Sequence, residues 1–127
     1  RTGRPSGATM TDMRHSELEA GRWCELTLAE QFGNIGSEVS RAIRWQGRNA
    51  DLARGACYRA LELFDLTLAD ARHRATPGRL REIARAREVV ADFLQGPNQY
   101  GATAASLQKY FDAFAIAARR RQLGRTD

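Results

Sequence analysis

Arginine is the residue type in this sequence with the clearest capacity for chemistry, because its guanidinium group binds phosphate oxygens through a fixed fork of donors. Two stretches far apart in the chain are rich in arginine: one lies between two predicted helices, and the other ends the last predicted helix. Their cationic or titratable side chains are those of Arg72, His73, Arg74, Arg79, Arg119, Arg120 and Arg121. If the fold brings both stretches to one end, they form an anion-binding or nucleic-acid-binding site.

Three carboxylates form a second group with possible chemistry, since carboxylate oxygens hold Mg²⁺. Glu62 and Asp65 are three residues apart in one predicted helix, and Glu38 lies in the helix before it. All-helical nucleotide pyrophosphohydrolases hold Mg²⁺ with Glu-x-x-Glu on one helix and Glu-x-x-Asp on the next, because the ion needs several oxygens around one centre. The first half of that pattern is missing, since Gly33 stands three residues after Glu30. A Mg-dependent pyrophosphohydrolase is therefore the alternative function.

No other catalytic or metal-binding motif is complete. Ferritin-like di-iron sites need Glu-x-x-His on two helices, and the sequence contains no such motif. The two cysteines, Cys24 and Cys57, are too few for a disulfide framework or a zinc site, and they indicate reduced thiols in a cytoplasmic protein. We therefore expect no catalytic residues and no cofactor, with Mg²⁺ entering only in the alternative interpretation.

The net charge of +5 is concentrated near the two ends of the sequence. Residues 1–9 carry two positive charges and residues 119–127 a net three, so residues 10–118 are neutral. A broad basic face is thus not indicated. The longest apolar run, residues 113–118, is too short to cross a bilayer, and residues 1–15 lack the apolar segment of a secretory signal. We expect a cytoplasmic protein with no membrane partner.

Four amphipathic helices must position these side chains. The first is expected at residues 27–45, where apolar residues recur at steps of three and four, and where Thr27 and Glu30 have the capping-box spacing. The others are expected at residues 50–69, 77–95 and 103–122. Their similar lengths and short turns predict an all-α fold, an antiparallel up-down-up-down four-helix bundle. A short N-terminal helical arm should pack Trp23 onto this bundle.

The chain is expected to form one domain. Residues 16–122 should make up the arm and the bundle, while residues 1–15 and 123–127 should be tails outside the fold. The apolar stripes predict the core, and Gly36 in the first helix, together with Gly33, predicts a close approach of a neighbouring helix. The core residues are expected to be Leu28, Phe32, Ile35, Val39, Leu61, Phe64, Ile83, Val90, Phe93, Leu107, Phe111 and Phe114.

The helix at residues 50–69 has more apolar surface than a bundle needs. Leu63 and Leu66 lie beside its main stripe, whereas each helix of a four-helix bundle buries one stripe. This surplus predicts a homo-oligomer. Packing of Trp23 against the same helix within one chain is the competing explanation.

Several segments resemble a family of small uncharacterised all-helical proteins of bacteria and archaea. They are LAEQ, NIGSEV and AIRW in the first helix and ALELFDLT in the second, with REVVADF and SLQKYF later, and the resemblance spans residues 23–120. It implies a compact helical fold and no functional residues, because the family has no assigned activity. The architecture is also similar to the nucleotidyltransferase-associated helical domains of toxin–antitoxin pairs and to the four-helix bundles that accompany reverse transcriptases. The nuclease motif Arg-x4–6-His of the former is missing upstream of both His15 and His73.

These observations predict a non-enzymatic helical module that acts by binding or by oligomerising, as an accessory to a nucleic-acid-handling partner. Its expected contacts are a second copy, a protein partner, and nucleic acid at the arginine-rich end.

Overall fold

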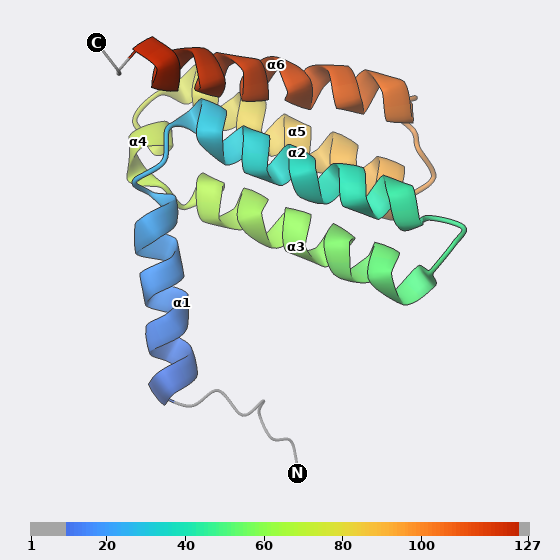
Figure 1. Ribbon diagram of the computed structural model, residues 1–127, viewed down its shortest axis with the longest axis horizontal. Coiled ribbons are helices and arrows are strands. Elements are labelled where there is room, and N and C mark those ends of the chain that lie inside the picture. Colours follow the sequence, from blue (N-terminus) through green and yellow to red (C-terminus); the bar gives the residue numbers. More distant parts are fainter. Residues whose placement is uncertain (1–9, 125–127) are drawn as a thin grey trace.

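The computed structural model of the protein describes the backbone of residues 10–124 and the side chains of residues 17–124. The chain is all-helical over this range, as expected, and its described part contains no strand. Six helices follow in order: α1 Met10–Trp23, α2 Leu28–Trp45, α3 Ala50–Leu68, α4 Ala71–Arg74, α5 Pro77–Gln95 and α6 Ala104–Gly124. Figure 1 shows α2, α3, α5 and α6 side by side, with α1 projecting away from them near the end that carries α4.

Capping signals in the sequence set the start of the first two long helices. Thr27 and Glu30 form the predicted capping box of α2, with Glu30 N–H donating to Thr27 Oγ1 at 3.1 Å and Thr27 N–H donating to Glu30 Oε1 at 2.8 Å. Asn49 caps α3 by accepting from the Leu52 N–H at 3.1 Å. The turn between these helices contains Gly47 at φ +78°, a conformation that glycine adopts without steric cost.

Two helix ends lie two or more residues from the predicted positions, and one short helix was not predicted. α1 begins at Met10 rather than at residue 16, and α6 continues to Gly124 rather than ending at residue 122. α4 lies within the segment 70–76, which we predicted as a loop, because the Asp70 side chain accepts from the Arg72 N–H and starts a helical turn there. The remainder of both predicted tails, residues 1–9 and 125–127, lies outside the described residues.

The core lies between the four long helices and is rich in aromatic rings. Phe32 of α2 is fully buried, and its ring centroid lies 5.7 Å from that of Phe64 and 4.8 Å from that of Phe114. Of the predicted core residues, eight are buried: Phe32, Ile35, Val39, Phe64, Ile83, Val90, Leu107 and Phe111. The other four pack against this cluster and are partly buried: Leu28, Leu61, Phe93 and Phe114.

α2 is the central helix, in contact with both α3 and α6. Its approach to α6 depends on Gly36, because a Cβ atom there would lie 2.5 Å from Phe111 Cβ. The predicted close approach is therefore confirmed at Gly36. At Gly33 the nearest atom to an added Cβ would be Ala115 Cα at 3.7 Å, which is an ordinary contact.

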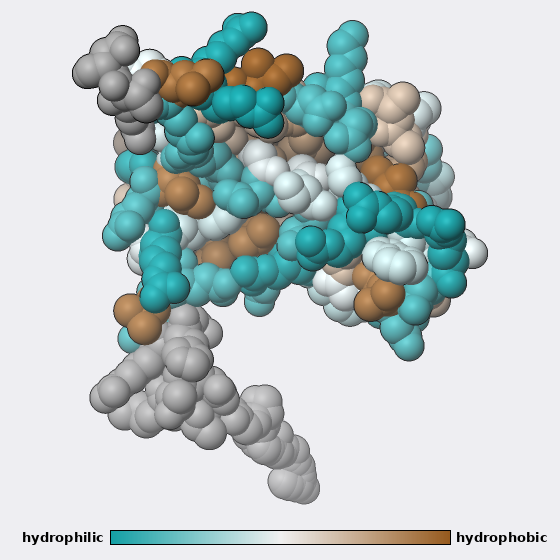
Figure 2. Space-filling view, viewed as in Figure 1, coloured by the Kyte–Doolittle hydropathy of each residue, from teal (hydrophilic) through white to brown (hydrophobic). Residues whose placement is uncertain are grey.

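The second apolar side of α3 is covered from within the chain by the end of α1. Trp23 is buried, belongs to the same cluster as Leu63, and donates its indole N–H to Thr67 Oγ1 at 2.9 Å. Figure 2 shows one face of the molecule, on which apolar residues form separate spots among hydrophilic ones. Within residues 10–124, no helix has the length and apolar character needed to cross a membrane.

Candidate anion-binding site

The short helix α4 is fixed by Asp70, which precedes it and is buried. The carboxylate accepts hydrogen bonds from the backbone N–H of Arg72 at 3.0 Å and from its guanidinium group, at 2.6 Å from Nη2 and 3.1 Å from Nε. Nη2 of Arg72 also donates to the Leu26 carbonyl at 2.6 Å, which ties α4 to the segment between α1 and α2. Arg72 is therefore held in one orientation, although about half of its side chain remains exposed.

Gln31 of α2 links this arrangement to α1 and to His73. Its amide Nε2 donates to the Trp23 carbonyl at 2.9 Å and to Asp70 Oδ2 at 3.1 Å. Both acceptors require the nitrogen of the amide, so its oxygen faces His73 Nε2 at 2.7 Å. His73 Nε2 must then carry the proton and donate, which leaves Nδ1 of the neutral ring as an acceptor. Nδ1 is buried and has no hydrogen-bond partner among the described residues.

The charge states of this cluster follow from its hydrogen bonds and its burial. The hydrogen bond from the Arg72 guanidinium lowers the pKa of Asp70 far below its usual value, against the opposing effect of burial. Burial lowers the pKa of His73, and the charges of Arg72 and Arg79 lower it further while Asp70 opposes the shift. His73 is therefore neutral near pH 7. We predicted His73 as one of the side chains that bind an anion; in the structure it is 1% exposed and neutral.

Three of the predicted arginines line one hollow of about 440 Å³ at this end of the molecule. Arg72 comes from α4, Arg79 from α5 and Arg121 from α6. The complete lining, which we call the basic hollow, is Thr27, Leu28, Ala29, Arg72, His73, Arg79, Ala117 and Arg121. Residues separated by almost fifty positions in the sequence are thus brought together by the packing of α6 beside α2.

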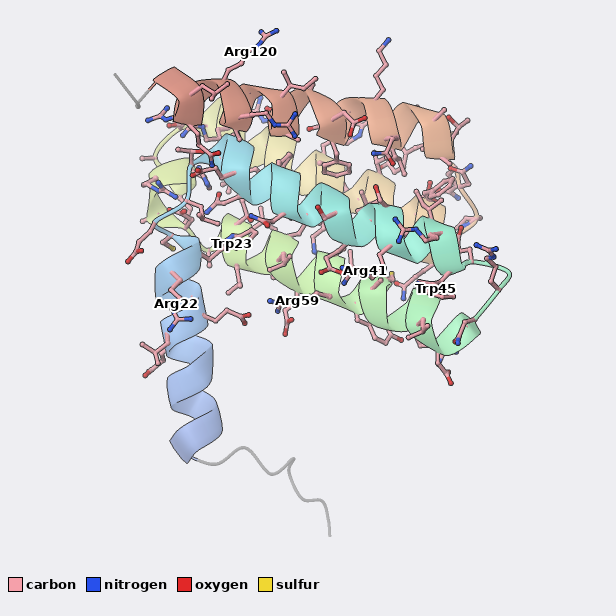
Figure 3. All side chains as sticks on the ribbon, viewed as in Figure 1. Arg22, Trp23, Arg41, Trp45, Arg59 and Arg120 are labelled. Carbon is pink, nitrogen blue, oxygen red and sulfur yellow. The ribbon has the colours of Figure 1, made fainter. Side chains whose placement is uncertain are left out.

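The other three predicted arginines do not line the hollow. Arg74 is exposed at the end of α4, and Arg119 and Arg120 are exposed on α6. Figure 3 shows Arg120 extending away from the neighbouring helices on the outer side of α6. Arg121 is also exposed, but it differs from Arg120 because it lines the hollow together with Ala117, four residues before it on the same side of the helix.

The electrostatics of the basic hollow favour an anion. Arg79 and Arg121 form no ion pair with any residue in the described part of the chain, whereas the charge of Arg72 is engaged by Asp70. The first turn of α2 also opens here, and the N–H groups of Leu28 and Ala29 have no acceptor within the helix. Glu30 is the nearby opposing charge, and its carboxylate accepts from the Thr27 N–H and from Gln122 Nε2.

The three carboxylates of the magnesium alternative are separated and paired with arginines. Glu38 lies 3.1 Å from Arg41, Glu62 lies 2.6 Å from Arg59, and Asp65 lies 2.8 Å from Arg87. Among the described residues, no three His, Cys, Asp or Glu side chains lie close enough to hold a metal ion. Glu62 instead shares Arg59 with Glu19 of α1, and this shared ion pair attaches α1 to α3.

Sequence reasoning did not find the buried polar residues beneath the hollow. They are Gln31, Thr67 and Asp70, each at most 2% exposed. Two sequence signals could have indicated their burial. Gln31 falls three residues after Leu28 on the apolar face of α2, and Thr67, Asp70 and His73 recur at steps of three, the spacing of residues on one helical face. Neither the predicted core nor the predicted site included Gln31, Thr67 or Asp70.

A comparison of the chain with protein-family models, curated proteins and solved structures finds no match.

Proposed function

We propose that this protein is a non-enzymatic helical binding module whose basic hollow takes the phosphate groups of a nucleic acid. In this proposal the four long helices form an antiparallel up-down-up-down bundle, and the module is a cytoplasmic accessory to a nucleic-acid-handling partner. The observation that carries the proposal is the convergence of Arg72, Arg79 and Arg121 on one hollow from three different helices.

Phosphate is the anion that this lining fits best. Guanidinium groups approach phosphate oxygens through paired N–H donors, and the free backbone N–H groups at the start of α2 add donors of the same kind. The side chain of Arg72 is already oriented by Asp70, so less conformational entropy is lost when it binds. Within the described residues, the guanidinium charges of both Arg79 and Arg121 have no ion-pair partner.

The rest of the lining argues against recognition of particular bases. Beside the arginines it offers Thr27, whose hydroxyl already caps α2, and the apolar side chains of Leu28, Ala29 and Ala117. Contacts to phosphate position a protein on nucleic acid, whereas sequence is read at the base edges. The proposed binding therefore has little sequence preference and weakens steeply as salt rises, because the bound phosphates release counterions.

The test is a salt series of binding, measured by fluorescence anisotropy, on a short labelled single-stranded RNA and a DNA of the same sequence. Replacing Arg121 by alanine should remove about one phosphate contact. The negative slope of log affinity against log salt concentration should then become less steep by about 1. Arg120→Ala is the matched control, since the side chain is exposed on the outer side of α6 and the charge change is identical. Arg79→Ala and its neighbour Arg81→Ala form a second pair on α5.

Two results would reject the proposal. One is equal binding by the Arg121→Ala and Arg120→Ala variants, which would mean that charge alone and not the hollow is responsible. The other is no binding of either nucleic acid at low salt. A mononucleotide can be tested as a competitor of the labelled nucleic acid. If it competes equally well at the same concentration of phosphate groups, the ligand is a small phosphate compound and not a nucleic acid.

Self-association remains a proposal of its own, with α1 as the element that favours it. α1 projects from the four long helices (Figure 1), and Leu18 on it is 56% exposed. A helix of this length is marginally stable in water without a packing partner, and a second copy would supply one for the part of α1 that projects beyond α3. Sedimentation equilibrium that gives only the 14.2 kDa species at about tens of micromolar would eliminate the homo-oligomer.

A further inference from the structure

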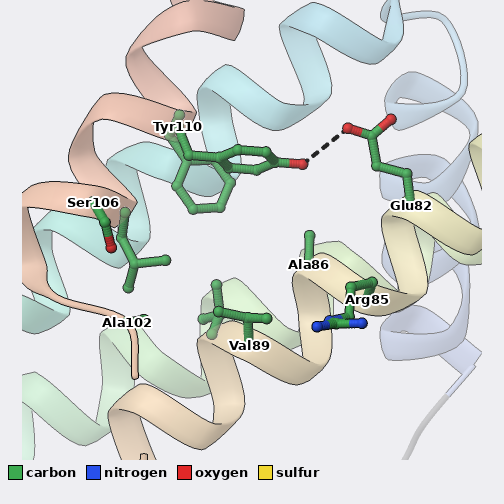
Figure 4. Close-up of a pocket in the computed structure, with 10 residues that line it drawn as sticks. Glu82, Arg85, Ala86, Val89, Ala102, Ser106 and Tyr110 are labelled. Atoms are coloured by element: carbon green, nitrogen blue, oxygen red, sulfur yellow. Dashed lines mark hydrogen bonds between the residues drawn. The ribbon is translucent and has the colours of Figure 1, made fainter. Parts of the chain in front are cut away.

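A second hollow of about 340 Å³ lies between α5 and α6, away from the basic hollow. Figure 4 shows it as a groove with α5 on one side and α6 on the other. Its base is made by buried core residues, among them Val90, Leu107 and Phe111. We call it the α5–α6 groove, and its lining shares no residue with the basic hollow.

The groove exists because small side chains stand where α5 and α6 face each other. Ala86 of α5, Ser106 of α6 and Ala102 of the preceding loop line it, and none is large enough to fill the space between the helices. One end is closed by a hydrogen bond across the two helices, from the Tyr110 hydroxyl to Glu82 Oε2 at 3.1 Å. Burial raises the pKa of the Tyr110 hydroxyl, with Glu82 adding to the shift, so the hydroxyl keeps its proton and this bond.

The polar groups at the groove differ in whether they already have partners. The Glu82 carboxylate accepts from Tyr110, and the Ser106 hydroxyl both accepts from the Thr103 N–H and donates to the Thr103 carbonyl. Arg85 lies with its guanidinium carbon 4.7 Å from the centre of the Tyr100 ring. In the described part of the chain it forms no ion pair and donates no hydrogen bond, so its N–H donors have no acceptor there. The Glu82 carboxylate likewise forms no ion pair among the described residues, but it already accepts the Tyr110 hydrogen bond, so the side-chain groups at the groove still without a hydrogen-bond partner are the N–H donors of Arg85.

We propose that the α5–α6 groove binds a small monocarboxylate with an apolar body, whose carboxylate pairs with Arg85. The apolar body would lie against Val89, Leu107 and Phe111, while the carboxylate stays at the exposed rim. A bidentate guanidinium–carboxylate pair supplies orientation as well as affinity. The volume is near the lower limit for ligand pockets, about 300 Å³, which restricts the ligand to one smaller than a typical drug molecule.

The experiment compares three probes that share an eight-carbon chain and differ only in the polar head: octanoate, octylamine and octanol. Binding to the full chain is measured by NMR titration below the concentration at which the probes form micelles. Octanoate should bind about tenfold more tightly than octanol, the effect of one charge-assisted pair, and octylamine should bind more weakly than octanol.

Two variants locate the site. Arg85→Met keeps the apolar stem and should reduce the affinity for octanoate to that for octanol, whereas Arg81→Met, a neighbour on α5 outside the lining, should leave both affinities unchanged. Ala102→Leu places a larger side chain in the groove and should lower the affinity for all three probes. Circular dichroism and a thermal unfolding curve establish that each variant is folded before it is compared.

Three outcomes would overturn the proposal. Tighter binding of octylamine would make Glu82 the recognised charge, and equal binding of the three probes would mean that no head group is recognised. Binding of octanoate that is unaffected by both Arg85→Met and Ala102→Leu would place the probe elsewhere on the molecule.

Discussion

Gly36 of α2 is the position where one added methyl group should disturb the fold most. A Cβ atom there would lie 2.5 Å from Phe111 Cβ and 2.9 Å from Phe111 Cγ. Carbon atoms in contact prefer about 3.5–4.0 Å, so the two helices would have to separate by about 1 Å. Phe111 cannot turn aside, because its own Cβ makes the closest contact and is fixed by the backbone of α6.

The expected loss of stability for Gly36→Ala combines two opposing effects. Overpacking of a buried contact costs about 1–3 kcal/mol, and the backbone-fixed contact at Gly36 belongs at the upper end of that range. Alanine is favoured over glycine inside a helix by about 1 kcal/mol. The free energy of unfolding should therefore fall by about 2 kcal/mol, the difference between these two effects.

Gly55→Ala on α3 is the matched control, because a Cβ atom there would have no neighbour within 4 Å. It should raise the free energy of unfolding by up to about 1 kcal/mol, so the two variants should differ by about 3 kcal/mol. Urea unfolding followed by circular dichroism measures both, with equal m-values as the check that the unfolded states are comparable. A Gly36→Ala variant as stable as Gly55→Ala would refute the close packing of α2 and α6.

Three further predictions test the core and the buried polar cluster. Phe64→Ala removes a fully buried ring and should cost about 3–5 kcal/mol in urea unfolding, whereas a loss below about 1 kcal/mol would place the residue on the surface. Trp23→Phe keeps an aromatic ring but loses the hydrogen bond to Thr67, so it should cost about 1 kcal/mol; an unchanged unfolding midpoint would contradict that contact. Burial lowers the pKa of His73, so the unfolded chain binds the proton more tightly than the folded chain does. The contribution of neutral His73 to the free energy of unfolding is therefore complete above pH 6.5, the usual pKa of histidine, and declines as the pH falls below it. The unfolding free energy of His73→Gln should fall less between about pH 8 and pH 5 than that of the unchanged chain, and parallel profiles would exclude His73 as the titrating group.

Much of the fold was predictable because local signals and helical periodicity agreed. The Thr27–Glu30 capping box and the Asn49 cap fixed the starts of α2 and α3 without reference to the rest of the chain. α4 was missed because its single turn has no apolar stripe. Its start depends on the Asp70 side chain, which is buried and also accepts a hydrogen bond from Gln31, 39 positions earlier in the sequence.

The candidate site was predictable only in part, because the sequence shows which residues are charged but not which charges are already paired. Arg72 was expected to contribute its charge to an anion-binding site, yet its guanidinium group is already engaged by Asp70 and by the Leu26 carbonyl. His73 was expected to add positive charge, yet burial beside Gln31 keeps it neutral. Both corrections come from long-range packing, which brings the start of α2 over the segment between α3 and α5.

The same packing separates neighbouring arginines on α6 into two groups, and this separation decides where a ligand can bind. Successive residues of a helix point in directions about 100° apart. Arg121 follows Ala117 and Ala118 by four and three residues, so it lies on the side that faces α2, whereas Arg120 extends to the outer side. Arg79 of α5 and the backbone N–H groups of Leu28 and Ala29 lie around the same hollow as Arg121. A run of three arginines therefore contributes one side chain to the hollow, and the site is defined by the faces of three helices rather than by the number of charges in the run.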